Sequence, residues 1–355
     1  MMATAVQDSG SRSGNRKTDG VQPTRTRRAV FGLLIGLLAG FVCWLVHRPV
    51  WGTPERLAQL PPPQAMLLMG SSDFVQVLVP ARAVLNGTDP FVNLYPGYVP
   101  YPLTAALVGI PVVGLSPSVG GALVMGVSVA LLTYLLLAQG HFWRLWLFAS
   151  LPFESALASL QLVPLVMALA LAGWAPLALL LKPQNALPLF FTYRARCWSF
   201  VAAAVVLGGS LWLIPSWPFR WWALLGAYEG VAPVVVFPGA LVFLALLCWE
   251  KPAARLLVLL ACCPQRDWYD ALSLWLIPST RRGMAILTAA SWLAFPFTLL
   301  PAIFPGLVWA HWHPLLRLGG CYLPALGVLL WEERATVAPR VGAIKRAVAG
   351  FVGSR

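Results

Sequence analysis

Residues 29–46 read AVFGLLIGLLAGFVCWLV, a stretch without a charged side chain. As a helix it is about 27 Å long, close to the roughly 30 Å of a bilayer's hydrocarbon core. Because lipid offers backbone N–H and C=O groups no hydrogen-bond partner, such a stretch must satisfy them internally as a helix. The sequence therefore predicts a membrane-spanning helix near the N-terminus.

The same apolar character recurs along the rest of the chain. Of the 355 residues 59% are hydrophobic and 10% charged, whereas about a quarter of the residues in soluble domains are charged. The two-residue alternation of membrane β-strands is absent. We therefore expect an all-α polytopic membrane helix bundle with about ten transmembrane helices. Further apolar blocks cover residues 118–138, 199–214, 233–249, 283–300 and 315–331.

The basic residues indicate how the chain is oriented. The net charge is +13, but these residues are scattered among the connections between apolar blocks, so no nucleic-acid partner is expected. Those before the first block place the N-terminus in the cytoplasm, and the lack of a cleavage site predicts an anchor. We predict a multi-pass plasma-membrane protein with a disordered basic leader (1–24), a membrane domain (25–334) and a basic cytoplasmic tail (335–355).

Several other kinds of site lack their motifs. The six cysteines show no CxxC spacing and are interpreted as small buried hydrophobes. The sequence contains no P-loop, HExxH motif, GxSxG elbow or dinucleotide-binding glycine turn. His311 and His313 stand beside Trp309 and Trp312, which is more typical of an interfacial aromatic belt than of a metal site. No metal ligand is assigned and no cofactor is expected with certainty; a divalent metal stays open, although no residue pattern supports one.

The first extracytoplasmic loop, residues 47–117, is much longer than the other connections, and long loops often carry function. Within it, residues 73–86 mix apolar and polar side chains at near-helical spacing, which predicts a short interfacial helix. Residues 101–115 predict a second interfacial helix or a half-span. The loop therefore places Asp73 and Asp89 at the outer membrane surface.

Four motifs follow one another in a consistent order. The first comprises Ser72-Asp73-Phe74, residues 81–91 (ARAVLNGTDPF) and residues 99–103 (VPYPL). The others are residues 159–165 (SLQLVPL), residues 181–184 (LKPQ), and Cys263-Pro264 with Trp268-Tyr269-Asp270. In this order they resemble glycosyltransferase family 87, whose members have the GT-C fold and use polyprenyl-phosphate-linked sugars. The chain differs at Ser159, where the family has glycine, and at Tyr269 and Asp270, where some relatives carry histidines.

The resemblance implies roles for eight residues. It makes Asp73 the catalytic base, or the residue that orients the acceptor, in a displacement that inverts the anomeric carbon. The substrate-binding residues that it implies are Arg82, Asp89, Tyr101, Gln161, Lys182, Tyr269 and Asp270.

The residues by themselves leave structural roles open for the same positions. Asp73 and Gln161 can cap helices, and Asp89 can form a turn. Arg82 can extend toward lipid headgroups. Lys182 either faces a functional cavity or marks a cytoplasmic helix end. Residues 267–270 can belong to a solvated loop.

The resemblance implies a transferase that moves a hexose, with mannose as the family-weighted sugar. The donor and co-substrate would be a polyprenyl-phosphate sugar, and the acceptor a hydroxyl of a lipid or glycan on the extracytoplasmic face. The other expected partners are membrane lipids. Two alternatives remain: a transporter or flippase for a lipid-linked substrate, and a non-catalytic GT-C-like scaffold. The internal symmetry of many transporters is not visible in the sequence.

Overall fold

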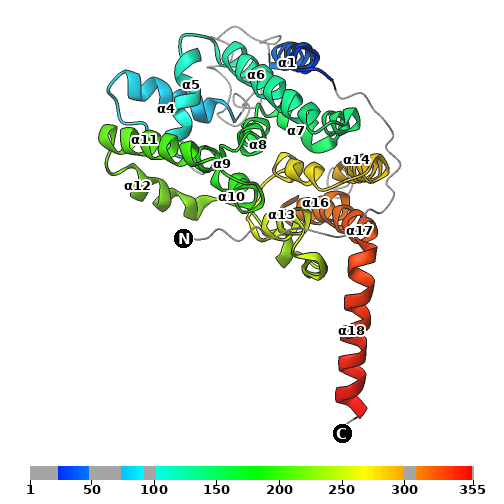
Figure 1. Cartoon of the computed structure of the whole chain (residues 1–355). Helices are drawn as coiled ribbons and strands as arrows, with labels where there is room; N and C mark the ends of the chain where they lie inside the picture. Colours follow the sequence, from blue (N-terminus) through cyan, green and yellow to red (C-terminus); the bar gives the residue numbers. More distant parts are fainter. Residues whose placement is uncertain (1–22, 48–72, 92–100, 300–308, 354–355) are drawn as a thin grey trace, which may run out of the picture.

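The computed structural model describes residues 23–47, 73–91, 101–299 and 309–353 (Figure 1). Within these ranges the chain is helical and has no β-strand, apart from an isolated antiparallel bridge between Val231 and Gln265. The predicted all-α class is therefore confirmed. The predicted disordered leader, except for residues 23 and 24, lies outside the described residues.

Three helical segments of the described chain are long and apolar enough to cross a membrane. They are α1 (Arg25–His47), α6 (Pro117–Ala138) and Trp312–Glu332, which joins α16 (Trp309–Arg317), the π-helical η9 (Leu318–Tyr322) and α17 (Leu323–Glu332). Two bent pairs raise the number to five if each is one span. They are α7 (Leu151–Ala158) with α8 (Val163–Leu171), bent by 118°, and α11 (Cys197–Leu213) with α12 (Trp217–Leu224), bent by 93°.

The described residues do not confirm the expected number of about ten spans, and two of the predicted blocks are divided. Residues 233–249 form two 3₁₀ helices, η5 (Pro233–Val235) and η6 (Gly239–Cys248). The block at 283–300 is covered by the 14-residue α14 (Arg281–Ala294), which begins two residues earlier, and by the 3₁₀ helix η8 (Phe295–Leu299). Pro238 lies between η5 and η6, and Pro296 is the second residue of η8; proline removes a backbone donor and clashes with the preceding turn.

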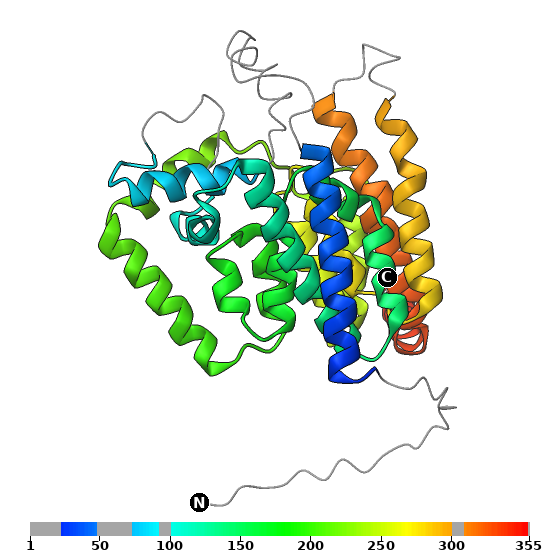
Figure 2. The same ribbon diagram turned by 90° about the horizontal axis from the view of Figure 1, so that it is seen from above.

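The first two long helices pack closely because glycines face each other between them. A Cβ atom at Gly36 would lie 2.5 Å from the carbonyl oxygen of Gly126 and 2.6 Å from the Cβ atom of Ala130. Gly32 and Gly40 precede and follow Gly36 by four residues and approach α6 in the same way. Such stripes of small residues let membrane helices meet backbone to backbone, and α1 runs alongside α6 in Figure 2.

Shorter helices fill the space between the long ones. The helix predicted at 73–86 is observed as α4 (Val75–Leu85), and its interfacial position stays a prediction. The region predicted as a second helix or half-span consists of η1 (Leu103–Ala105), α5 (Ala106–Gly109) and η2 (Ile110–Val112), which together are too short to cross a bilayer. The remaining helices are η3 (Phe142–Ala149), α9 (Ala175–Leu179), α10 (Pro183–Thr192), η4 (Leu225–Ala227), α13 (Pro252–Cys262) and η7 (Trp268–Leu276).

Large apolar side chains cover the outer surface of several helices. On α11, Trp198 is 76% exposed and Trp212 is 84% exposed, and α1 exposes a row of leucines that includes Leu33 and Leu37. An apolar surface of this extent marks contact with a membrane or a partner rather than with water. Together with the long apolar helices, it indicates a membrane protein.

The predicted basic tail forms a helix, α18 (Arg334–Gly353). It leaves the end of α17 and extends away from the body of the molecule in Figure 1. Near its start, the Arg340 guanidinium donates hydrogen bonds to the Glu250 carboxylate at 2.9 Å and to the Leu247 carbonyl oxygen. The cytoplasmic location of this segment stays a prediction.

Candidate functional site

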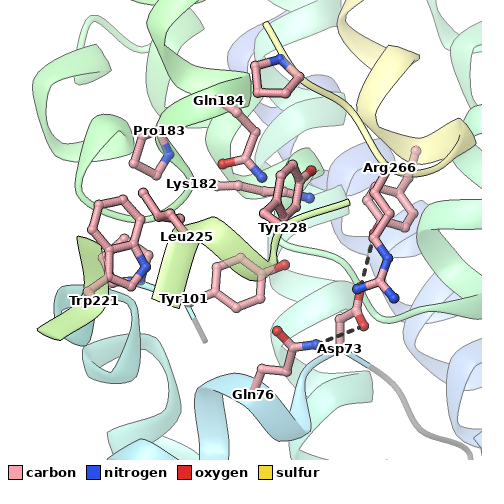
Figure 3. Close-up of a pocket in the computed structure, with 13 residues that line it drawn as sticks. Asp73, Gln76, Tyr101, Lys182, Pro183, Gln184, Trp221, Leu225, Tyr228 and Arg266 are labelled. Atoms are coloured by element: carbon pink, nitrogen blue, oxygen red, sulfur yellow. Dashed lines mark hydrogen bonds between the residues drawn. The ribbon is translucent and has the colours of Figure 1, made fainter. Parts of the chain in front are cut away.

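A cavity of about 190 Å³ lies where several short helices end (Figure 3). Its walls come from the turn before α4, the segment before η1, the start of α10, the region from α12 to residue 228, and the segment between α13 and η7. The lining residues are Asp73, Gln76, Tyr101, Pro102, Lys182, Pro183, Gln184, Trp221, Leu225, Tyr228, Pro264, Arg266 and Tyr269. The cavity thus gathers polar and aromatic side chains from distant parts of the sequence.

Asp73 lies in the turn that leads into α4, where its backbone N–H donates to the carbonyl oxygen of Ser159 at 2.9 Å. Its carboxylate accepts hydrogen bonds from three side chains: Gln76 at 3.2 Å, Tyr269 at 3.1 Å, and Gln161. The N-cap position of α4 is Phe74 and has no side-chain cap. Asp73 therefore faces the cavity and does not cap the helix.

Gln161 connects Asp73 to a buried cation. Its amide nitrogen donates to the Asp73 carboxylate, while its amide oxygen accepts from Lys182 Nζ at 2.7 Å and from the Tyr101 hydroxyl at 2.7 Å. A side-chain amide has both a donor nitrogen and an acceptor oxygen. It can therefore donate to a carboxylate and accept from an ammonium at the same time. The helix-capping role open from the sequence is not observed for Gln161.

Lys182 forms an ion pair with Asp270 inside the protein. The Lys182 side chain Nζ lies 3.0 Å from Asp270 Oδ1, and the two residues are 3% and 0% exposed. The other Asp270 oxygen accepts from the backbone N–H groups of Arg266, at 2.9 Å, and Asp267, at 3.4 Å. Lys182 Nζ also lies 4.3 Å from the centre of the Tyr269 ring, a cation–π distance. Residues 267–270 are therefore not a solvated loop.

Breaks between short helices bring these residues together. Gln161 occupies the break between α7 and α8, directly after Leu160, whose φ of 48° lies in the left-handed region. Lys182 occupies the break between α9 and α10, as the N-cap residue of α10. Non-glycine residues with positive φ are uncommon and strained, and they cluster at functional sites. Proline at the first or second position of α8, α9 and α10 fixes where these helices begin.

The electrostatic environment makes Asp73 a stronger base than a solvated aspartate. Burial raises the pKa of Asp73, and the positive charge of Lys182 and the hydrogen bond from Tyr269 counteract this only in part. Burial, and next the negative charge of Asp73, place the pKa of Tyr269 well above its ordinary value, so its hydroxyl remains a donor. A carboxylate with a raised pKa is suited to accept a proton near neutral pH.

Arg82 lies apart from this hydrogen-bonded group. Its guanidinium donates to the carbonyl oxygens of Val113, at 3.2 Å, and Leu115, at 2.8 Å. These carbonyls follow the last turn of η2, where helix ends leave acceptors unsatisfied. Arg82 thus connects α4 to the end of the helical segment that follows η1.

Asp89 also lies apart from it. Its carboxylate pairs with Arg220 of α12 and accepts a hydrogen bond from the Phe91 backbone N–H at 2.9 Å. The bond to Phe91 is the Asx type of turn that the sequence left open for this residue. The hydrogen bond from Arg220 holds the pKa of Asp89 below its ordinary value. This pair connects the end of α4 to the helix that carries Trp221 into the cavity wall.

A second polar group supports the segment that carries Arg266. The buried Arg317 guanidinium donates to the backbone carbonyl oxygens of Gln265, at 3.0 Å, and Asp267, at 3.3 Å. The His313 ring lies 3.5 Å from the Asp267 carboxylate. Burial raises the pKa of Asp267, whereas the hydrogen bond and charge of His313 lower it. Together the lowering effects are larger, so the pKa of Asp267 is below its ordinary value. The described part of the chain contains no group of side chains that would hold a metal ion.

The cavity also contains residues that the sequence did not single out. Gln76 follows Asp73 by three residues, so helical spacing could have indicated it. Arg266 lies within the late motif, so its proximity to that motif could have indicated it. Trp221 and Tyr228 enter the wall because α12 turns back against the body at a 93° bend. No local pattern in the sequence predicts that bend.

We compared the chain with models of known protein families, with curated proteins and with solved structures, and none of the three comparisons gave a significant match. The resemblance to glycosyltransferase family 87 and the GT-C fold therefore stay predictions.

Proposed function

We propose that this protein is a membrane glycosyltransferase that moves a hexose, with mannose the first choice, from a polyprenyl-phosphate donor to a hydroxyl of a lipid or glycan. The observation that carries this proposal is the Asp73 carboxylate, which has a raised pKa and lines a cavity that also contains the Arg266 side chain. A base and a cation in one cavity are what sugar transfer from a lipid phosphate requires. The site works on the extracytoplasmic face.

In the proposed reaction Asp73 accepts the proton of the acceptor hydroxyl. The hydroxyl oxygen forms a bond to the anomeric carbon as the bond from that carbon to the phosphate oxygen breaks. The electron pair of the broken bond leaves with the polyprenyl phosphate, and the anomeric configuration inverts. Because Tyr269 and Gln161 both donate to the carboxylate, they keep one of its oxygens oriented while the proton is transferred.

Arg266 is the residue proposed to bind the donor phosphate. It lines the cavity, and its planar guanidinium matches phosphate geometry. The positive charge of Lys182 is already neutralised by Asp270 at 3.0 Å, so its role is to hold Gln161 and thereby Asp73. The aromatic side chains of Tyr101, Trp221 and Tyr228 provide apolar walls for a sugar ring.

The first test measures transfer of labelled mannose from a polyprenyl-phosphate donor in membranes that contain wild-type protein or Asp73→Asn. The amide keeps the size of the side chain but cannot accept the proton, so we expect transfer to fall by about 10²–10⁴-fold. A matched control is Glu250→Gln, the same change at an exposed carboxylate that pairs with Arg340. Protein levels are equalised before activities are compared.

Each outcome distinguishes between functions. Loss in Asp73→Asn with activity kept in Glu250→Gln supports both the reaction class and the base. Full activity in Asp73→Asn would move the base to another residue. Absence of transfer by the wild type across a panel of donor sugars and acceptors would contradict the transferase and favour the scaffold or the transporter.

A second candidate function is transport of a lipid-linked substrate. The observation that favours it is the bend of 118° between α7 and α8, with Gln161 at the break, because transporters build substrate sites at interrupted helices. The protein reconstituted in liposomes with a fluorescent polyprenyl phosphate separates the two candidates. Movement of the label to the opposite leaflet without sugar transfer would support transport.

A further inference from the structure

The helix α18 combines a uniform charge with a one-sided apolar pattern. Residues 334–353 include four basic and no acidic residues, Arg334, Arg340, Lys345 and Arg346 being the basic ones. Positions 337, 341, 344, 348 and 351 are all apolar and follow one another at spacings of four, three, four and three. This spacing places them along one side of a helix. Lys345 follows Val341 by four residues, so positive charge borders the apolar side.

The orientation of α18 differs from that of the long helices. In Figure 1 it runs down the page, whereas α1 is seen nearly end-on. In Figure 2, turned by 90°, α1 runs along the page and α18 is seen end-on, near the end of the molecule where α1 begins. A helix placed crosswise to a membrane-spanning helix, at the level of its end, lies along the membrane surface.

The described contacts of α18 with the rest of the protein lie near its start. Val337 packs against the core, and Arg340 binds Glu250 and Leu247. The later turns extend beyond the body (Figure 1). These turns carry Lys345 and Arg346, which no acidic residue of the same helix neutralises.

We propose that α18 lies in the headgroup layer of the leaflet at which α1 begins and binds anionic lipids there. The apolar side enters the boundary with the acyl chains, Lys345 at its border meets lipid phosphates, and Arg346 on the outer side adds to the attraction for anionic lipid. Charge complementarity and the surface orientation of the helix favour lipid over a second copy of the chain, which would bring like charges together. This proposal does not depend on sugar transfer.

The test uses the full chain in liposomes, with the exposed Cys197 and Cys262 replaced by serine. A fluorophore is attached at Val348→Cys, on the apolar side, or at Ala343→Cys, well away from it around the helix. Spin-labelled lipid serves as the quencher, in phosphatidylcholine with or without phosphatidylglycerol. We expect quenching at position 348 to be severalfold stronger than at position 343, and to increase with phosphatidylglycerol.

Charge removal gives a second, independent readout. The pair Lys345→Gln and Arg346→Gln is expected to abolish the increase caused by phosphatidylglycerol at position 348. The matched pair Arg25→Gln and Arg27→Gln removes the same charge from the start of α1 and is expected to leave that increase unchanged. Equal quenching at positions 343 and 348, absence of quenching at both, or energy transfer between differently labelled copies would each overturn the proposal.

Discussion

The pair formed by α1 and α6 and the group around Asp73 show two different ways of packing a chain in a membrane. In the pair, uninterrupted helices satisfy every interior backbone group, and glycines such as Gly36 allow the backbones to approach. Around Asp73, helices stop after two or three turns and charged side chains lie in the interior. The comparison teaches that regular helices provide the frame, whereas interruptions create the polar cavity.

The largest effect is expected from breaking the buried ion pair. Lys182→Met leaves the fully buried carboxylate of Asp270 without its cation, and we expect a loss of about 3–5 kcal/mol in the free energy of unfolding. The double variant Lys182→Met with Asp270→Asn removes the unpaired charge and is expected to recover more than half of that loss. Thermal unfolding in detergent measures the loss in the single variant and the recovery in the double variant.

The control for this prediction is Lys251→Met. Lys251 pairs with Glu333 at 2.9 Å, but both side chains are partly exposed, so the expected cost is about 0–1 kcal/mol. Equal losses for Lys182→Met and Lys251→Met would contradict the distinction between the polar interior and the surface.

A smaller effect is expected from crowding the regular pair. Gly36→Ala places a Cβ atom 2.5 Å from the Gly126 carbonyl oxygen, so α1 and α6 must separate, at a cost of about 1–3 kcal/mol. The matched variant Gly208→Ala lies in α11, where nothing lies within 4 Å of an added Cβ atom. It should leave the unfolding temperature unchanged or raise it, because alanine favours helices. Similar behaviour of the two variants would show that the glycines do not set the helix separation.

The smallest effect concerns one hydrogen bond of the cavity. The bond from Tyr269 lowers the pKa of Asp73, so Tyr269→Phe should raise that pKa further. If transfer requires ionised Asp73, activity rises as pH increases through this pKa, and the acidic limb of the pH profile should move to higher pH. A bond worth about 1 kcal/mol corresponds to a shift of roughly 0.7 pH unit.

The control here is Tyr134→Phe, on α6 beside Arg28, which should leave the profile unchanged. A profile that stays in place in Tyr269→Phe, with activity retained, would show that the acidic limb does not report Asp73.

The sequence predicted regular helices better than interrupted ones. Continuous apolar runs such as residues 29–46 and 118–138 correspond to α1 and α6, because a run without a breaker has one low-energy solution in lipid. The run at 233–249 contains Pro238 and divides into two 3₁₀ helices instead. Apolar composition alone does not reveal such division, since short and long helices can be equally apolar.

For the candidate site, the motifs indicated which residues to consider better than they predicted where each side chain lies. Of the residues singled out from the sequence, Asp73, Tyr101, Gln161, Lys182, Tyr269 and Asp270 lie in one connected group. Arg82 and Asp89 belong to the same first loop, yet they bind neighbouring structural elements. Whether a loop residue faces a cavity depends on the direction in which its helix packs, and spacing along the sequence does not specify that direction.

The ion pair of Lys182 and Asp270 also constrains how the protein is synthesised. The ribosome delivers Lys182 well before Asp270, and a buried charge without its partner is strongly destabilising. The segment around α9 and α10 therefore gains its full stability only once the last third of the chain has arrived. A chain truncated before residue 270 would leave Lys182 without this ion pair.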